Sequence, residues 1–230
     1  MPGGAAERLS IIVPVLNEAD RITPSLGALQ ALRRRGHQVL VIDGCSADDT
    51  AERALCLADD VIVGPRCRAR QMNLGAARAT GEVLLFLHAD TVLPDRADAV
   101  LLQGLADSGC GWGRFDVVIE GSHPILAVVA WFMNYRSRLT GIATGDQAIF
   151  VRRILFEALG GFRDQPLMED IELSKRLRRL GPPLCIHDRV VTSGRRWETR
   201  GVWRTILLMW RLRWLYYMGV TPERLAAMYR

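Results

Sequence analysis

The first third of the chain alternates continuous apolar runs with segments that are apolar on one side only. Leu9–Val15, Val39–Ile42 and Glu82–Leu87 are apolar runs of strand length. Such runs, with polar turns around them, are typical of strands buried on both faces of a parallel sheet. Between the first two, Ser25–Arg35 carries leucines at helical spacing and ends at Gly36. This alternation predicts strand–helix–strand units and a mostly parallel sheet.

The alternation continues up to Asp95, and after it the pattern changes. No internal repeat, low-complexity tract or linker divides the sequence, so we expect one domain over residues 1–230. The predicted fold class is α/β, with a central sheet between two layers of helices. The further elements expected are helices over Thr50–Leu57, Asp98–Leu105, Pro124–Arg138, Arg153–Leu159 and Ile171–Leu180, strands over Val61–Val63, Gly111–Ile119 and Ala148–Val151, and a loop followed by a helix over Arg66–Ala79.

Composition narrows the class of protein. The 230 residues are 49% hydrophobic and 24% charged, as in an ordinary globular domain with one substantial core. The net charge of +5 is evenly spread and no known nucleic-acid-binding module is present, so we expect no nucleic-acid partner. The five cysteines are scattered, with no CxxC pair, which favours the reducing cytoplasm. We expect neither a signal peptide nor a membrane span.

Acidic residues recur where the predicted strands end. Glu18 and Asp43 follow the first two strands, and the third runs directly into His88-Ala89-Asp90. In open α/β sheets, the carboxyl ends of the strands meet at the ligand-binding edge. Clustered carboxylates repel each other, and a divalent metal ion or the donors of a substrate relieve that repulsion. A single Asp at the end of a strand could equally cap the next helix. The neighbouring motifs therefore have to distinguish a helix cap from a ligand-binding carboxylate.

A basic stretch lies between the second and third of these acids. Arg66, Arg68 and Arg70 would neutralise a diphosphate, and Gln71 and Asn73 would add hydrogen bonds. Taken alone, the stretch is more typical of a solvated helix face.

Four motifs, taken in order, resemble a known family. The chain resembles the family 2 inverting glycosyltransferases over nearly its whole length, and within them a small bacterial subgroup often labelled selenium-domain-associated or arsenosugar-biosynthesis transferases. The general family resemblance rests on Pro14-Val15-Leu16-Asn17-Glu18, Val41-Ile42-Asp43-Gly44-Cys45-Ser46-Ala47-Asp48-Asp49-Thr50, Leu87-His88-Ala89-Asp90 and Glu169-Asp170, and the closer one on Phe86–Thr91, Thr144–Ala148, Leu167–Asp170 and Arg195-Arg196-Trp197.

The resemblance implies a GT-A (Rossmann-like) fold, a nucleoside-diphosphate sugar donor with UDP as the expected nucleotide, and a divalent metal ion, Mn²⁺ or Mg²⁺. It divides the domain into a nucleotide-binding half (1–95), an acceptor half (96–200) and a C-terminal helical segment (201–230). Asp90 would be the metal ligand that survives from the family's Asp-x-Asp motif. The residues implied to bind the donor are Pro14, Glu18, Asp43, Arg68, Arg70, Ala89 and Asp90.

By the same resemblance, Asp170 would be the general base that deprotonates the acceptor hydroxyl, with Glu169 assisting it. The base must lie across the sugar from the metal, because in-line attack inverts the anomeric carbon; such a carboxylate works best with a raised pKa. Gly145-Asp146-Gln147, which by itself is a turn with an Asx hydrogen bond, would contact the acceptor. Arg195, Arg196 and Trp197 would also lie there.

His88 stands where the family has the first acid of Asp-x-Asp. Imidazole binds Mn²⁺ but suits Mg²⁺ poorly, so His88 is a doubtful metal ligand and the metal is left open. A structural histidine at a strand end is an equal alternative. His187 is expected to be structural or exposed.

The segment 202–218 is rich in tryptophan, leucine and arginine. Its rings and arginines would suit a membrane interface. Its apolar residues are spread around the whole helix, which favours core packing or a homodimer contact over a peripheral membrane contact.

The sequence thus predicts an enzyme that transfers a sugar to an unidentified acceptor. A non-catalytic sugar-nucleotide-binding module, or a membrane-associated assembly subunit, is the main alternative because His88 breaks the motif. A sugar nucleotidyltransferase is disfavoured, since it needs a glycine-rich phosphate loop where this chain has Pro14–Glu18.

Overall fold

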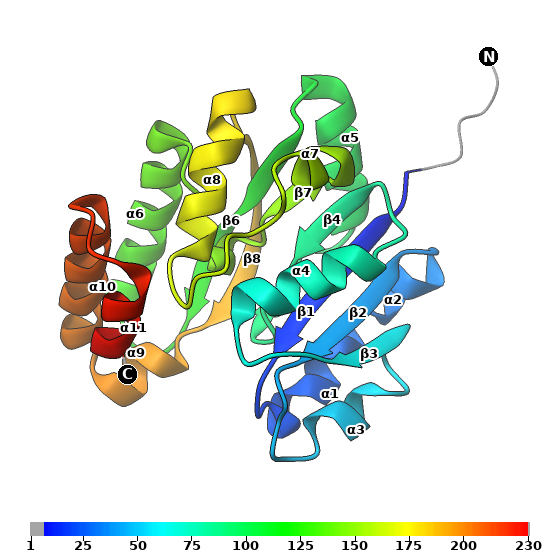
Figure 1. Cartoon of the computed structure of the whole chain (residues 1–230), viewed down its shortest axis with the longest axis horizontal. Coiled ribbons are helices and arrows are strands. Elements are labelled where there is room, and N and C mark those ends of the chain that lie inside the picture. The colour runs from blue at the N-terminus through cyan, green and yellow to red at the C-terminus, as the bar shows by residue number, and fades with distance from the viewer. Residues whose placement is uncertain (1–6, 230) are drawn as a thin grey trace.

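An eight-stranded mixed sheet, seen in the computed structural model of residues 7–229 (Arg196 without its side chain), forms the centre of the molecule (Figure 1). Its strands lie in the order β3-β2-β1-β4-β7-β6-β8-β5. The strands are β1 (Leu9–Val15), β2 (Gln38–Asp43), β3 (Asp60–Val63), β4 (Val83–Phe86), β5 (Thr91–Val92), β6 (Trp112–Glu120), β7 (Phe150–Arg152) and β8 (Leu184–Ser193).

Helices cover both faces of this sheet (Figure 1). The expected α/β architecture with three layers is confirmed. The helices are α1 (Ala19–Ala28), α2 (Gln30–Arg34), α3 (Thr50–Ala54), α4 (Arg68–Arg78), α5 (Ala97–Ser108), α6 (Ile125–Thr140), the 3₁₀ turn η1 (Gly145–Gln147), α7 (Arg153–Ala158), α8 (Glu169–Leu180), α9 (Arg195–Arg200), α10 (Val202–Tyr217) and α11 (Pro222–Tyr229).

The two faces of β1 explain why the strand is apolar throughout. Ile11 and Val13 point into one core, which they share with α1, α5 and α6. Ile12 points into a second core on the other face, formed with α4 and α8. Side chains alternate between faces along a strand, so a strand covered on both faces has no polar side.

The parallel arrangement holds for the first four strands. β3, β2, β1 and β4 are parallel, so their carboxyl ends lie along one edge of the sheet. Beyond β4 the sheet is mixed: β7 is antiparallel to both of its neighbours, β8 is parallel to β6, and β5 is antiparallel to β8.

β8 and the first helix are among the elements that differ from the pattern-based expectation. The sequence pattern did not predict β8, because three consecutive exposed residues, His187, Asp188 and Arg189, interrupt its apolar pattern, opposite a register shift in β6. The first helix begins six residues earlier than expected, at Ala19. It starts there because Thr50 Oγ1 and Asp48 Oδ2 accept hydrogen bonds from the backbone N–H groups of Glu18 and Ala19.

The C-terminal helices form a third, smaller cluster against the start of α8. Leu212 of α10 and Leu225 of α11 are buried there with Met168 and Ile171. Within residues 7–229, no helix is both long and apolar enough to cross a bilayer.

Candidate functional site

A cavity of about 910 Å³ opens at the carboxyl edge of the parallel strands. The end of β1, the segment after β4 and the start of α4 line one side. The turn η1 and the start of α8 lie at its centre, and α6 and α10 line the other side. Twelve of the predicted site residues lie on its surface, namely Pro14, Glu18, Arg68, His88, Ala89, Asp90, Gly145, Asp146, Glu169, Asp170, Arg195 and Trp197.

Asp90 reaches this cavity because β4 ends at Phe86 and the chain leaves the sheet through Leu87-His88-Ala89. Its carboxylate is half-buried. Its carboxylate accepts a long hydrogen bond of 3.4 Å from Thr91 Oγ1 to Oδ1, and no other from the residues that the structure describes. Asp90 is therefore a carboxylate at the sheet edge with lone pairs left for a ligand.

Glu18 lies near Asp90 in the cavity wall. Burial raises the pKa of Glu18 above its ordinary value, the charge of Arg195 opposes this shift, and the charge of Asp90 adds to it. Arg195 Nη2 lies 3.6 Å from Glu18 Oε1. Two of the three acids expected to converge at the strand ends, together with one arginine, thus meet here.

Asp43, the third of these acids, is turned away from the cavity. Its carboxylate accepts hydrogen bonds from the backbone N–H of Ser46 (2.8 Å) and from the Ser46 hydroxyl. Ser46 Oγ in turn accepts from the N–H of Asn17, whose side chain accepts from Ala47. Asp43 thereby fixes the loop after β2 against the loop after β1.

The two arginines proposed as alternatives for the donor lie in different places. Arg68 lines the cavity, whereas Arg70 forms a two-point ion pair with exposed Asp164, with distances of 2.7 and 2.6 Å, and does not line it. Gln71 also lines the cavity, but its amide donates to the carbonyl groups of Val15 and Ile42 and so joins the ends of β1 and β2. The interpretation of this stretch as a solvated face holds for Arg70 only.

The turn η1 connects the two acidic motifs. His88 Nδ1 lies 3.3 Å from Asp146 Oδ1, and the N–H of Gly145 donates to Asp170 Oδ2 at 2.9 Å. A Cβ at Gly145 would lie 2.4 Å from His88 Nε2, so the imidazole requires glycine at this place. His88 therefore contacts a carboxylate of the turn.

The charges of this turn are adjusted by its neighbours. Burial disfavours the ionised form of Asp146, but the hydrogen bond and charge of His88 outweigh it, and its pKa lies below the usual value. The reverse holds for Glu169, because burial and the charge of Asp170 both raise its pKa. Environments that separate the pKa values of nearby carboxyl groups are common where acid–base chemistry occurs.

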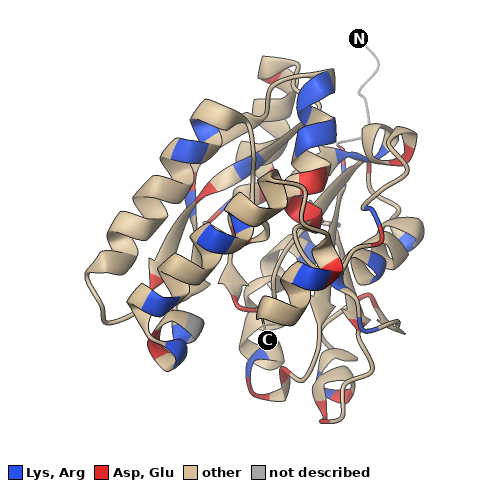
Figure 2. Ribbon diagram, turned by 60° about the vertical axis from the view of Figure 1, so that its left-hand side comes forward, with Lys and Arg blue, Asp and Glu red and all other residues tan. Residues whose placement is uncertain are grey.

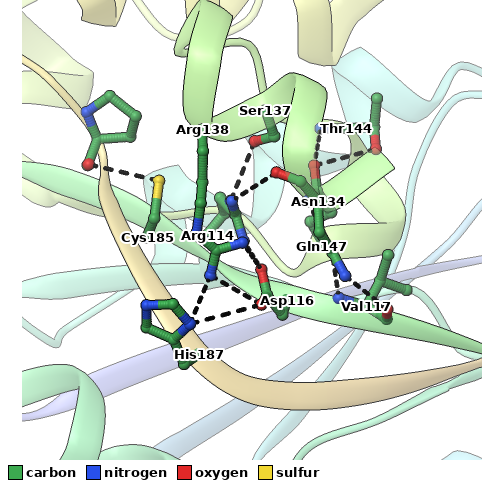
Figure 3. Close-up of polar contacts among 11 residues, drawn as sticks. Arg114, Asp116, Val117, Asn134, Ser137, Arg138, Thr144, Gln147, Cys185 and His187 are labelled. Atoms are coloured by element: carbon green, nitrogen blue, oxygen red, sulfur yellow. Dashed lines mark hydrogen bonds and ion pairs between the residues drawn. The ribbon is translucent and has the colours of Figure 1, made fainter. Parts of the chain in front are cut away.

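A buried polar network behind the cavity holds η1 in place (Figure 3). The fully buried Arg114 donates to Ser137 Oγ (3.0 Å) and Asn134 O (3.2 Å), and forms an ion pair with Asp116. Asn134 Oδ1 accepts from Gln147, which closes a capping box with Thr144. Gln147 is thus buried, faces this network and does not line the cavity.

Sequence reasoning missed this network. Arg114 and Asp116 lie in the strand predicted over Gly111–Ile119. Two charged residues two positions apart lie on one face of a strand. Such a pair indicates a buried ion pair, because buried charges occur in pairs. His187 lies at the edge of the network, where it contacts Arg138 Nη2 at 2.8 Å, and its side chain is 85% exposed, as expected.

Backbone strain concentrates around the site. Of the five non-glycine residues with positive φ in the described chain, Asn17 and Cys45 lie in the loops after β1 and β2, and Ala148 and Met168 border η1 and α8. Such conformations cost about 1 kcal/mol or more each and persist where the surroundings enforce them. The loops that present the acidic motifs are therefore held in one shape.

The donor set fits a metal ion only with help from a ligand. No group of three or more His, Cys, Asp or Glu side chains able to hold a metal occurs within residues 7–229. Mg²⁺ and similar ions are commonly held by one or two carboxylates together with substrate phosphates. Asp90, with free lone pairs in the cavity wall, fits that arrangement.

Two further arginines on the cavity surface, Arg136 and Arg213, were also missed. Arg136 lies within the helix predicted over Pro124–Arg138, and Arg213 lies in the segment 202–218, whose arginines were considered only for a membrane interface. Arg196, part of the predicted acceptor motif, has a side chain outside the described part of the structure.

Comparisons with known proteins identify the family of the chain. Residues 10–155 match the family model of glycosyl transferase family 2, a range that ends before Glu169-Asp170. The chain is 25% identical over 236 aligned residues to the probable glycosyltransferase YdaM of Bacillus subtilis, covering 92% of this chain and 55% of that protein. It is 29% identical over 143 residues to the uncharacterized glycosyltransferase Rv0539 of Mycobacterium tuberculosis, covering 59% and 63%.

Solved structures share the fold. The mannosyltransferase PcManGT of Pyrobaculum calidifontis, in complex with GDP-Man and Mn²⁺, superposes with a TM-score of 0.66 at 22% identity, covering 97% of this chain and 69% of that one. S. aureus TarS 1–349 in complex with UDP gives 0.64 at 16% identity, covering 81% and 60%. The chain spans about half to two thirds of these proteins. Its matched residues, which include the motifs after β1, β2 and β4, establish that the chain belongs to glycosyl transferase family 2.

Proposed function

We propose that the protein is an inverting glycosyltransferase that moves a sugar from a nucleoside-diphosphate donor, with UDP as the expected nucleotide, to an acceptor hydroxyl. The observation that carries the proposal is one cavity lined both by Asp90, at the edge of the nucleotide-binding half, and by Asp170, at the start of α8. One carboxylate faces the expected diphosphate and the other the expected acceptor.

On the donor side, Pro14, Glu18 and Ala89 would line the nucleotide pocket, and Arg68 would pair with the diphosphate. Asp43 would act indirectly, through the loop that it fixes. Asp90 would hold the metal ion, Mn²⁺ or Mg²⁺, which would neutralise charge on the leaving diphosphate. His88 is better suited to orient Asp146 than to bind the metal, given their 3.3 Å contact.

Asp170 would be the general base. The acceptor oxygen forms a bond to the anomeric carbon while the bond from that carbon to the diphosphate oxygen breaks. The hydroxyl proton goes to Asp170, and the bonding electron pair leaves with the nucleoside diphosphate. The N–H of Gly145 fixes Oδ2 of this carboxylate, and burial and the charge of Asp170 raise the pKa of the adjacent Glu169.

The acceptor would lie against Gly145, Asp146 and Trp197, with Arg195 at the border between the two substrates. Gln147 would position the turn from behind. The motifs after β4, in η1, before α8 and in α9 also support membership of the selenium-domain-associated or arsenosugar-biosynthesis subgroup. The five free cysteines are compatible with a cytoplasmic protein.

A panel of nucleotides and nucleotide sugars tests this proposal. UDP, GDP and their sugars are added with and without Mn²⁺, and the midpoint of thermal unfolding is followed together with nucleotide release from each donor. A nucleotide that binds only the folded protein must raise the midpoint. Binding followed by nucleotide release supports a transferase, and binding without release from any donor supports a non-catalytic module instead. If no nucleotide shifts the midpoint, the donor site is wrong.

A further inference from the structure

Helices α6 and α10 each present to the cavity a stripe of apolar residues that ends at an arginine. Residues three or four apart lie on one face of a helix, so each stripe forms a continuous apolar strip along the cavity wall. In α6 the stripe consists of Ile125, Val128, Phe132 and Arg136, and in α10 of Trp203, Ile206, Trp210 and Arg213.

The two arginines have N–H groups that nothing in the described chain satisfies. Nε and Nη2 of Arg136 and Nε of Arg213 are buried and have no hydrogen-bond partner within residues 7–229. Burial, together with the nearby charge of Arg213, lowers the pKa of Arg136 to about 10. Buried donors without partners cost free energy. A ligand that accepts from them would recover that cost.

The two helices that carry this pair contribute no negative charge. Neither α6 nor α10 contains an Asp or Glu, and their ribbons carry only arginine among the charged residues (Figure 2). Asp170 acts electrostatically on both arginines and Asp146 acts on Arg213, but these carboxylates already interact with Gly145 and His88. The missing partner is therefore an anion, and two guanidinium groups match the double charge of a phosphate ester.

The apolar residues of each stripe indicate that the ligand also has an apolar part. Phe132, Trp203 and Trp210 line the cavity and yet are 52%, 63% and 65% exposed. A free phosphate would leave these rings in water. An apolar chain beside them would remove that surface from water, at about 25 cal/mol per Å².

We propose that the acceptor is an amphiphile with a phosphate-ester head, held by Arg136 and Arg213 beside Asp170, and with an apolar chain lying between α6 and α10. The identification of this amphiphile as the acceptor rests on the proposed transferase function. The binding site itself is defined by this chain's own residues.

Calorimetric titrations with octyl phosphate, 1-octanol and inorganic phosphate test the site. The wild-type protein binds octyl phosphate more tightly than either of the other two. R136Q and R213Q each weaken octyl phosphate binding about 10- to 100-fold. R211Q, an exposed arginine on the same helix, leaves it unchanged. Equal binding of octyl phosphate by R136Q, R213Q and wild type overturns the head-group assignment, and equal binding of inorganic phosphate and octyl phosphate overturns the chain assignment.

Two further measurements keep this test independent of folding and of the donor site. F132S changes an exposed residue, and it weakens octyl phosphate binding without changing inorganic phosphate binding. UDP titrations with Mn²⁺ in R136Q and R213Q match the wild type if the pair serves the acceptor. Loss of UDP binding with octyl phosphate binding retained assigns the arginines to the donor and overturns the inference. Failure of UDP to bind even the wild type refutes the proposed function instead, because octyl phosphate still reports on the arginine site.

Discussion

The two sides of the cavity are built in opposite ways. On the side of the parallel strands, polar side chains are already hydrogen-bonded within the protein: Asp43 to Ser46, Asn17 to Ala47, and Gln71 to the ends of β1 and β2. On the side of α6 and α10, rings are exposed and the donors of two arginines have no partner in the described residues. On the side of the strands, most polar groups are hydrogen-bonded within the protein and a few are free. On the side of α6 and α10, the arginine donors and the exposed rings need a ligand to complete their interactions.

The largest effect is expected where the two sides meet, at Asp170. D170N keeps an acceptor oxygen for the Gly145 N–H, so the fold is retained, but it removes the base. Turnover, measured as nucleotide release in the presence of an acceptor, should fall by about 10²- to 10⁴-fold. D188N, at an exposed carboxylate on β8, is the matched control and should not change turnover. Near-normal transfer by D170N would show that another group takes the proton.

A large effect is also expected at the turn between the sides. In G145A the new Cβ would lie 2.4 Å from His88 Nε2, so the imidazole and Asp146 must shift. We expect turnover to fall by about tenfold or more, since misplacement by an ångström is costly in catalysis. G27A provides the control, because nothing lies within 4 Å of that Cβ and alanine is favoured in a helix by up to about 1 kcal/mol. Full activity of G145A would mean that the His88–Asp146 contact has no role.

The pH dependence of stability should separate a site carboxyl from a structural one. The pKa of Glu169 is raised, so the folded protein retains this proton to higher pH than the unfolded chain does. Its contribution to stability is present at low pH and is lost as the pH rises through the raised pKa. E169Q should therefore increase the free energy of unfolding at pH 7 and remove this loss.

Asp98, far from the site, has the opposite sign. Burial opposes its ionisation, but hydrogen bonds from Arg35 and His37 lower its pKa, so its contribution is present above the ordinary value and is lost as the pH falls through the lowered one. D98N should thus destabilise the protein at pH 7 and matter less at acidic pH. Denaturant unfolding at several pH values measures both variants, and the same sign for the two would contradict the account.

The smallest effects distinguish the two arginines near the nucleotide side. R68Q, in the cavity wall, should weaken UDP binding about tenfold through loss of a charged hydrogen bond. R70Q removes only an exposed ion pair with Asp164, which is worth roughly 0–1 kcal/mol, and should leave UDP binding unchanged. Calorimetric titration decides between them, and weaker binding by R70Q alone would reverse the assignment.

The contrast between the two sides also explains what the sequence could reveal. The parallel strands and their acidic ends were predictable because each strand is apolar over its whole length and each motif lies within a few residues of a strand end. Burial of Asp43 and Gln147 was not predictable, since both residue types also occur in binding sites and their partners depend on tertiary contacts. A site role for Arg136 and Arg213 was not predictable, because single arginines in helices are common and only the fold brings the two helices to one cavity.

The proposed roles of Asp90 as metal ligand and of Asp170 as general base are tested most directly by one pair of calorimetric titrations. UDP is titrated into D90N and D170N, each with and without Mn²⁺. We expect D170N to bind UDP with the affinity of the wild type, including any increase in affinity from Mn²⁺. We expect D90N to lose that increase. If Mn²⁺ still increases the affinity of D90N for UDP, or no longer increases that of D170N, the assignment of Asp90 to the donor and of Asp170 to the general base is contradicted.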